Sequence, residues 1–232
     1  MPAERIFEVA RKAALARGVR DVELLVGETE DALTRFANNA IHQNVADRQT
    51  HASLRVAIDR RTARVTTNRL DDASIERAVD QAVEIARCLE PDPDLPDLFE
   101  PEPIEPVERY HAPTAGCTPE QRARVVAEAI RIVESAGQTA AGIFSTGSSV
   151  ETILNTRGVA ATHRESMTRF SITAMAADSS GWAKASATSL DAFDPAALAR
   201  RASVKAARSA EPRELEPGKY TVILEPLAAV DM

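Results

Sequence analysis

The chain has 232 residues, of which 44% are hydrophobic and 27% charged, and its formal net charge is −7. This balance is typical of a folded globular protein and excludes a disordered one, while the acidic charge argues against direct contact with nucleic acid, whose phosphates attract basic surfaces. No apolar run approaches the ~20 residues that cross a bilayer, no signal-peptide core follows the N-terminus, and the two cysteines form no CxxC pair, so we expect a cytoplasmic protein.

The first half of the sequence predicts a helix, a set of short strands and a second helix. Apolar residues share one helical face over residues 2–16, and Gly18 can end this helix. Turns are expected at Asn38-Asn39 and at residues 59–61. A second helix carries its apolar face over residues 75–86. The strands between the helices are expected over residues 22–26, 33–37, 41–45, 54–58 and 63–67.

Residues 91–117 are predicted to form an acidic, proline-rich linker. From Pro91 to Pro106 prolines alternate with acidic residues. Proline interrupts helix and ladder hydrogen bonds and the acids repel one another, so this stretch should be extended. The alternative is an acidic strip that docks a partner.

The second half repeats the order of the first. Thr118 can cap a helix that has Pro119 at its first position and Gln121 three residues after the cap, and Gly137 can end it. Asp194 precedes a proline that can begin the last helix. Strands are expected over residues 141–145, 151–154, 170–174 and 182–187, with turns at residues 155–158 and 178–181.

The two halves align by pattern at an offset of about 118 residues, which suggests an internal duplication. The alternative is that two units of this kind simply look alike. Strands with one apolar face, covered by helices at their ends, predict an α+β fold. We therefore expect two similar α-β-meander-α units with antiparallel sheet, which either share one continuous sheet or stand separately.

The expected domain organisation has four parts. Residues 1–90 form the first unit, residues 91–117 the linker, residues 118–210 the second unit, and residues 211–232 the start of a C-terminal β-rich domain. Lys219 to Pro226 is a strand candidate, and the apolar residues after it predict a further element. We therefore expect the sequence to be a fragment of a longer chain.

Four segments resemble the TldD/PmbA family, also known as modulators of DNA gyrase. Residues 33–44 resemble its early RF-x-N-x-x-I-x-Q segment, and residues 61–68 resemble the hairpin that follows. Residues 155–159 resemble the N-x-x-G turn of its second half, and residues 217–226 resemble the strand that opens its C-terminal domain. The resemblance covers essentially the whole chain and favours the TldE/PmbA branch.

This resemblance implies a function in proteolysis. In the family, a TldD-type subunit carries a zinc-binding H-E-x-x-x-H motif and pairs with a TldE-type subunit that lacks it. Such a pair cleaves flexible peptides. The motif is absent from this sequence, so we expect no catalytic residue, no metal ligand and no cofactor in this chain, and no activity of the chain alone. The implied partners are a TldD- or TldE-type subunit, in a homo- or heterodimer, and a peptide.

The expected role is therefore subunit association and substrate gating. An exposed strand over residues 33–37 could bind an extended peptide by strand addition. The candidate peptide-binding residues are Arg35, Phe36, Asn38, Asn39 and Gln43. A minor alternative places a metal between His42, His51 and Asp47, if the two histidines face each other across adjacent strands. The alternative function is a stand-alone binding or scaffold module without enzymatic activity.

Overall fold

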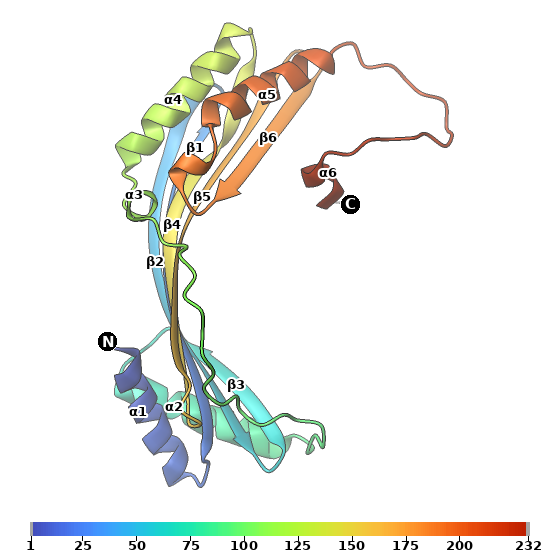
Figure 1. Cartoon of the computed structure of the whole chain (residues 1–232). Helices are drawn as coiled ribbons and strands as arrows, with labels where there is room; N and C mark the ends of the chain where they lie inside the picture. Colours follow the sequence, from blue (N-terminus) through green and yellow to red (C-terminus); the bar gives the residue numbers. More distant parts are fainter. Residues whose placement is uncertain (1, 231–232) are drawn as a thin grey trace.

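A computed structural model describes residues 2–230. One antiparallel six-stranded sheet, in the order β3-β2-β1-β4-β5-β6, runs through the whole molecule (Figure 1). The two predicted units thus share a continuous sheet, and the α+β fold class is confirmed. The elements are α1 (Ala3–Ala16), β1 (Asp21–Ala37), β2 (Ala40–Ile58), β3 (Arg61–Thr67), α2 (Asp72–Cys88), α3 (Ala112–Ala115), α4 (Pro119–Ser135), β4 (Thr139–Asn155), β5 (Ala160–Met175), β6 (Ser180–Ala187), a 3-10 turn (Leu190–Ala192), α5 (Pro195–Arg208) and α6 (Pro226–Val230).

The helices begin where their caps predict. Thr118 accepts a hydrogen bond from the Gln121 backbone N–H at 3.3 Å, and the Gln121 side chain accepts one from the Thr118 N–H at 2.8 Å. Asp194 caps α5 in a similar way, through the Ala196 N–H at 2.8 Å. These bonds satisfy N–H groups that have no partner inside the helix.

The strands are longer than predicted. The sequence favours separate short strands, whereas β1 and β4 have 17 residues each, β2 has 19 and β5 has 16. Polar residues such as those of 28–31 interrupt the apolar alternation. The backbone ladder nevertheless continues through them, because its hydrogen bonds join main-chain groups whatever the side chain.

The strand registers confirm the internal repeat. Asp21 pairs with Ala57 in the first hairpin, and the residues 118 positions further on, Thr139 and Met175, pair in the second. The same displacement relates the pair Leu54–Val65 to the pair Ile172–Ala183. A local two-fold axis therefore passes through the centre of the sheet, between β1 and β4.

All four long helices cover the same face of the sheet, which we call the helix face; the other is the open face. Helices α1 and α2 lie at one end and α4 and α5 at the other, with a narrow waist between them (Figure 1). Each end has its own apolar core. The first core includes Ile6, Leu24, Leu54 and Val79, and the second includes Val126, Phe144, Phe170 and Ala202.

The tip of each long hairpin reaches the opposite end. Phe36, at the end of β1, lies in the second core. The backbone N–H of Asn39 donates to the Ala140 carbonyl at 3.3 Å, and its side-chain oxygen accepts from the Ala140 N–H at 2.6 Å. Thr156 makes the equivalent pair of bonds with Val22, at 3.0 and 3.1 Å. These two clasps join the units, whose bounds as domains remain a prediction.

The strand predicted over Lys219 to Pro226 is not formed. Residues 219–225 pair with no strand among the residues described, and Ile223 is 99% exposed. A strand needs a ladder partner, and in the described structure these residues do not run along an edge of the sheet. In the described range, no helix is long and apolar enough to cross a membrane.

Candidate functional site

The waist is the part of the sheet where functional features gather. Strand β3 pairs only with residues 52–58 of β2, and β6 pairs only with residues 168–175 of β5. Among the residues described, no strand therefore pairs with the outer edge of β2 over residues 40–51 or with that of β5 over residues 160–167. Exposed strand edges present unpaired N–H and C=O groups that can bind another extended chain.

Residues 89–111, which we call the strap, cover the free edge of β5. The Ser166 N–H donates to the Arg109 carbonyl at 3.0 Å, and the Arg109 side chain pairs with Glu165 at 2.9 Å. The strap then turns onto the helix face, where α3 begins. Asp47 is the counterpart of Glu165 in the repeat, and no described segment covers the edge of β2 there. The two halves therefore share their fold but differ at the waist, because the strap covers the outer edge of β5 and leaves that of β2 uncovered.

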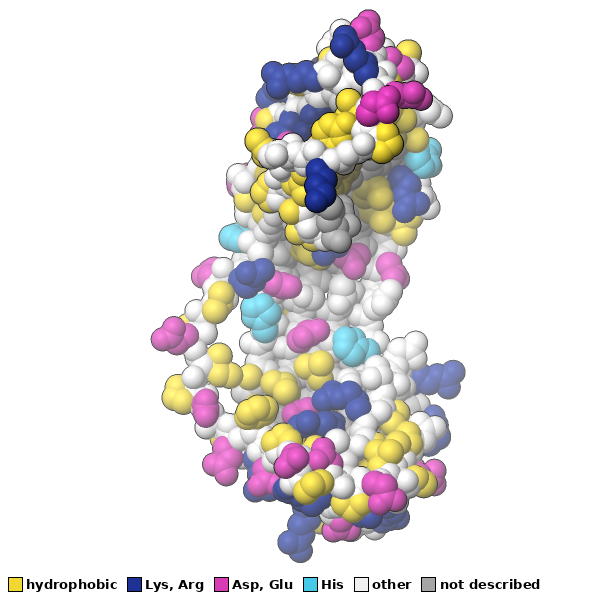
Figure 2. All heavy atoms as spheres, turned by 90° about the vertical axis from the view of Figure 1, so that its right-hand side faces the viewer, with side chains coloured by type: hydrophobic (Ala, Val, Ile, Leu, Met, Phe, Trp, Pro, Cys, Tyr) yellow, Lys and Arg dark blue, Asp and Glu magenta, His cyan; other side chains and the backbone are white. Residues whose placement is uncertain are grey.

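A row of ionisable side chains crosses the open face at the waist. Gly27 on β1 pairs with His51 on one side and with Glu151 on the other, and Glu151 pairs with His163. The His51 imidazole lies over Gly27, where no side chain competes for the space. Figure 2 shows this face, with histidine and acidic side chains side by side across the waist.

These residues do not fit a zinc site. In residues 2–230, no three His, Cys, Asp or Glu side chains come together as metal ligands. The alternative that placed a metal between His42, His51 and Asp47 is wrong, because all three lie on β2 and its histidines cannot face each other across strands. The metal implied by the family resemblance therefore has no ligand set in this part of the chain.

The strap and the sheet line an open cavity of about 710 Å³. Its floor is apolar and consists of Leu25, Ile153 and Ala161, which are neighbours across three strands. Ile104 and Val107 of the strap form the opposite wall. Most of the remaining lining residues are ionisable, namely Glu105, Glu108, Arg109, Tyr110, Glu151, His163 and Arg164.

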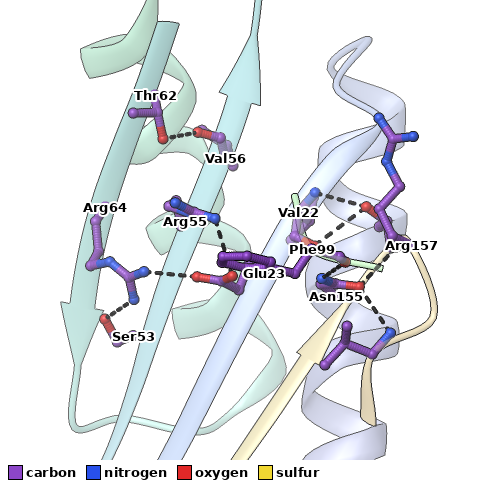
Figure 3. Close-up of polar contacts among 12 residues, drawn as sticks. Val22, Glu23, Ser53, Arg55, Val56, Thr62, Arg64, Phe99, Asn155 and Arg157 are labelled. Carbon is purple, nitrogen blue, oxygen red and sulfur yellow. Dashed lines mark hydrogen bonds and ion pairs between the residues drawn. The ribbon is translucent and has the colours of Figure 1, made fainter. Parts of the chain in front are cut away.

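Near the start of the strap, a buried carboxylate holds two arginines on the open face. Glu23 is 6% exposed and binds Arg64 at 2.8 Å and Arg55 at 3.1 Å (Figure 3). Close by, the Phe99 carbonyl accepts a hydrogen bond from the Asn155 side chain at 2.8 Å. The carboxylate is already shared by two cations, so this cluster fixes β1, β2 and β3 to one another.

A buried arginine lies on the helix face. Arg122, on α4, is 1% exposed and donates to the Cys117 carbonyl at 2.7 Å and to the Thr146 hydroxyl at 3.1 Å. It also donates to the Thr34 hydroxyl at 3.3 Å. Burial raises the pKa of the Cys117 thiol, although Arg122 opposes this shift. The thiol is therefore a structural group rather than a reactive one.

The candidate peptide-binding residues surround one hairpin tip. Phe36 is buried and stacks on Phe170, with ring centroids 6.3 Å apart. Asn38 and Asn39 adopt left-handed conformations, with φ of 51° and 59°. The Arg35 side chain donates to that of Gln43 at 3.2 Å on the surface. Phe36, Asn38 and Asn39 thus shape the turn. Of the five candidates, Arg35, Asn38 and Gln43 are exposed, and Arg35 and Gln43 lie on strands β1 and β2.

Strand addition at residues 33–37 is wrong as a mechanism. Strand β1 lies in the middle of the sheet and pairs with β2 on one side and β4 on the other along this stretch. Its backbone groups therefore have no capacity for a further strand. The free edges belong to the waists of β2 and β5 and to the short strands β3 and β6.

Sequence reasoning missed the row at the waist and the cavity. The repeat offset relates the two hairpins to each other, but it does not say which strands pair at the centre. The pairing of β1 with β4 places Gly27 beside Glu151, 124 positions away in the chain. The available signal was Gly27 itself, because a glycine inside a strand pattern often marks a close approach by another group.

Two family models match the chain. Residues 22–86 match the model described as PmbA/TldA metallopeptidase domain 1, and residues 68–210 match the one described as PmbA/TldA metallopeptidase central domain. No match was found among curated protein sequences.

Three solved structures share the fold. A proposed modulator of DNA gyrase from Thermotoga maritima has a TM-score of 0.80 at 16% identity, over 94% of this chain and 50% of its own. TldE from Thermococcus kodakarensis has a TM-score of 0.76 at 15% identity, over 88% and 47%. A proposed modulator of DNA gyrase from Bacteroides thetaiotaomicron has a TM-score of 0.79 at 16% identity, over 94% and 52%. The chain thus spans about half the length of these relatives.

Proposed function

Because the chain belongs to the TldD/PmbA family of metallopeptidases, we propose that it is the N-terminal, non-catalytic part of a TldD/PmbA-type peptidase system. In this role it associates with another subunit and gates flexible peptides. The matched family regions support the proposal, since they are a first and a central domain. Zinc and peptide cleavage are assigned to the catalytic subunit.

The observation that carries the proposal is the free edge of β2 at the waist. Residues 42–49 are all exposed, and within residues 2–230 no strand lies beside the outer edge of β2 over residues 40–51. An edge of this length is large enough for a second chain to add a strand or a loop. Val45, 39% exposed, is an apolar side chain on this segment. We place the subunit contact here, in a homo- or heterodimer, without direct contact to nucleic acid.

The gating role fits the outer edge of β5, where the strap lies beside the apolar floor of the cavity. Exposed Arg35 and Gln43 remain candidate peptide contacts through their side chains. Cys88 and Cys117 are free thiols, which suits the reducing cytoplasm in which we place the complex.

Association is tested by light scattering on the chain mixed with the TldD-type subunit of the same genome. We expect a stable complex, and Val45→Lys should weaken it because a charge must then be desolvated at the contact. Leu15→Lys is the matched control, since Leu15 is an exposed apolar residue of α1, far from the waist. The mixture should cleave an unfolded peptide, whereas the chain alone should not. Two non-interacting proteins, or cleavage by the chain alone, would contradict the proposal and favour a stand-alone module or an enzyme.

A further inference from the structure

The cavity under the strap lies between two extended segments. On one side is the edge of β5 from Ala161 to Arg164, and on the other is the strap from Ile104 to Tyr110. Figure 2 shows the strap as a projecting segment beside the waist. Only at Arg109 does the strap make a β-bridge to β5, through Glu165. Before that point, the two segments are separated by the cavity.

The edge of β5 in this cavity has backbone groups free for binding. Ser166 donates its outer N–H to Arg109. Outward-pointing groups alternate along a strand, so Thr162 and Arg164 present their N–H and C=O groups to the same side. Outside the ladder with β4, Thr162 forms no backbone hydrogen bond among the residues described. The Arg164 carbonyl faces the Arg109 N–H at the bridge, so Arg164 contributes its N–H. An extended chain laid in the cavity would satisfy them.

The floor and the wall select the side chains of such a chain. Leu25, Ile153 and Ala161 lie side by side on the floor, and Ile104 in the wall is 70% exposed. An apolar side chain bound here removes its own surface and that of these lining residues from water, which favours binding.

The charges around the cavity favour a cationic ligand. Glu105, Glu108 and Glu151 line it, and none has an ion pair in the described part of the chain. The lining cation Arg109 is paired with Glu165. The other, Arg164, lies 3.3 Å from the centroid of the Tyr110 ring. The field in the cavity is therefore negative, and it complements lysine or arginine.

We propose that the cavity between the strap and β5 is a binding slot for an extended peptide with alternating apolar and basic residues. The peptide pairs with the outer backbone groups of Thr162 and with the N–H of Arg164. Its apolar side chains contact the floor of Leu25, Ile153 and Ala161, and its cations face the strap glutamates. This slot deepens the proposed gating role and rests on it, because it names the kind of peptide that the chain selects.

The test is fluorescence anisotropy with the full chain and a fluorescein-labelled peptide Lys-Leu-Lys-Leu-Lys. Ala161→Phe fills the floor and should raise the Kd at least about ten-fold. Ala40→Phe, at an exposed hairpin tip, is the matched control and should leave the Kd unchanged. Glu105→Lys together with Glu108→Lys, both on the exposed strap, should weaken the binding of this peptide. The double variant should also strengthen the binding of Glu-Leu-Glu-Leu-Glu.

Backbone pairing has its own readout. In an extended peptide, the N–H groups of the leucines point to one edge and those of the lysines to the other. One peptide is N-methylated at the leucines and a second at the lysines, and the peptide that loses the N–H groups facing β5 should bind at least about ten-fold more weakly. The slot would be overturned if the wild type did not bind the peptide, or if Ala161→Phe left the Kd unchanged or weakened binding no more than Ala40→Phe. It would also be overturned if N-methylation or the charge changes in the strap left the Kd unchanged. Association with the TldD-type subunit would still stand in those cases, which separates failure of the slot from failure of the proposed function.

Discussion

The ring of Phe36 packs directly over Gly142, its partner across β1 and β4. A Cβ added at Gly142 would lie 2.6 Å from the ring and 2.2 Å from the Ser171 carbonyl oxygen. This close approach lets the tip of the first hairpin enter the second core.

Gly142→Ala should therefore destabilise the fold by about 1–3 kcal/mol, because a backbone oxygen and a buried ring must both move. Gly27→Ala is the matched control, since the three atoms nearest to its Cβ would all belong to the imidazole of His51, a side chain that can rotate away. We expect Gly27→Ala to cost less than about 1 kcal/mol. Urea unfolding curves of the two variants measure the difference, and equal losses would contradict the packing argument.

Asn39→Ala should weaken the clasp between the two units. The change removes the hydrogen bond from the Ala140 N–H at 2.6 Å and the bond to the Gln138 carbonyl at 3.3 Å, and it leaves alanine in a left-handed conformation. We expect a loss of about 1–3 kcal/mol in thermal or urea unfolding. Asn38→Ala carries the same conformational cost without a recorded side-chain bond, so it should lose less. A larger loss of unfolding free energy for Asn38→Ala than for Asn39→Ala would contradict the role of the clasp.

Arg122→Ala should destabilise the protein by about 3–5 kcal/mol, because it leaves a cavity and removes the arginine partner of the Cys117 carbonyl and the Thr146 hydroxyl. Arg122→Met keeps most of the side-chain volume and should lose less stability.

Thiol labelling reports on the same region. Cys88 is exposed and should react at once in the native protein, whereas buried Cys117 should react in the Arg122→Ala variant. A variant as stable as the wild type would show that the buried arginine contributes nothing net.

The contact between α1 and α2 should depend on pH. The hydrogen bond from Arg17 holds the pKa of Asp80 below its ordinary value. A carboxyl with a lowered pKa stabilises the fold above the pKa of the unfolded chain, about 3.9. That stabilisation is lost as the pH falls through the lower, folded-state value.

Asp80→Asn should thus reduce the free energy of unfolding at neutral pH, by up to about 1 kcal/mol because Asp80 is half exposed. The difference from the wild type should shrink below about pH 4. Glu84→Gln, also on α2 and with no recorded ion pair, is the control and should show no such trend. A difference that is constant with pH would mean that the Arg17–Asp80 bond is not the cause.

The sequence by itself determined the local elements and the repeat. The caps at Thr118 and Asp194 and the turn at Asn38-Asn39 follow from contacts within a few residues, which a short stretch of sequence encodes. The offset of 118 residues was also readable, because each half repeats its own periodicity, and the paired registers of the two hairpins confirm it.

Tertiary structure alone decided the features of the waist. The pairing of β1 with β4 buries the edge proposed for strand addition, sets Gly27 between His51 and Glu151, and leaves different edges free. The strap then lines the open cavity beside β5. The contacts between β1 and β4 and between the strap and β5 join segments more than 50 positions apart. They use backbone groups that every residue has, so at exposed polar positions the side chains carry little information about which strands will meet.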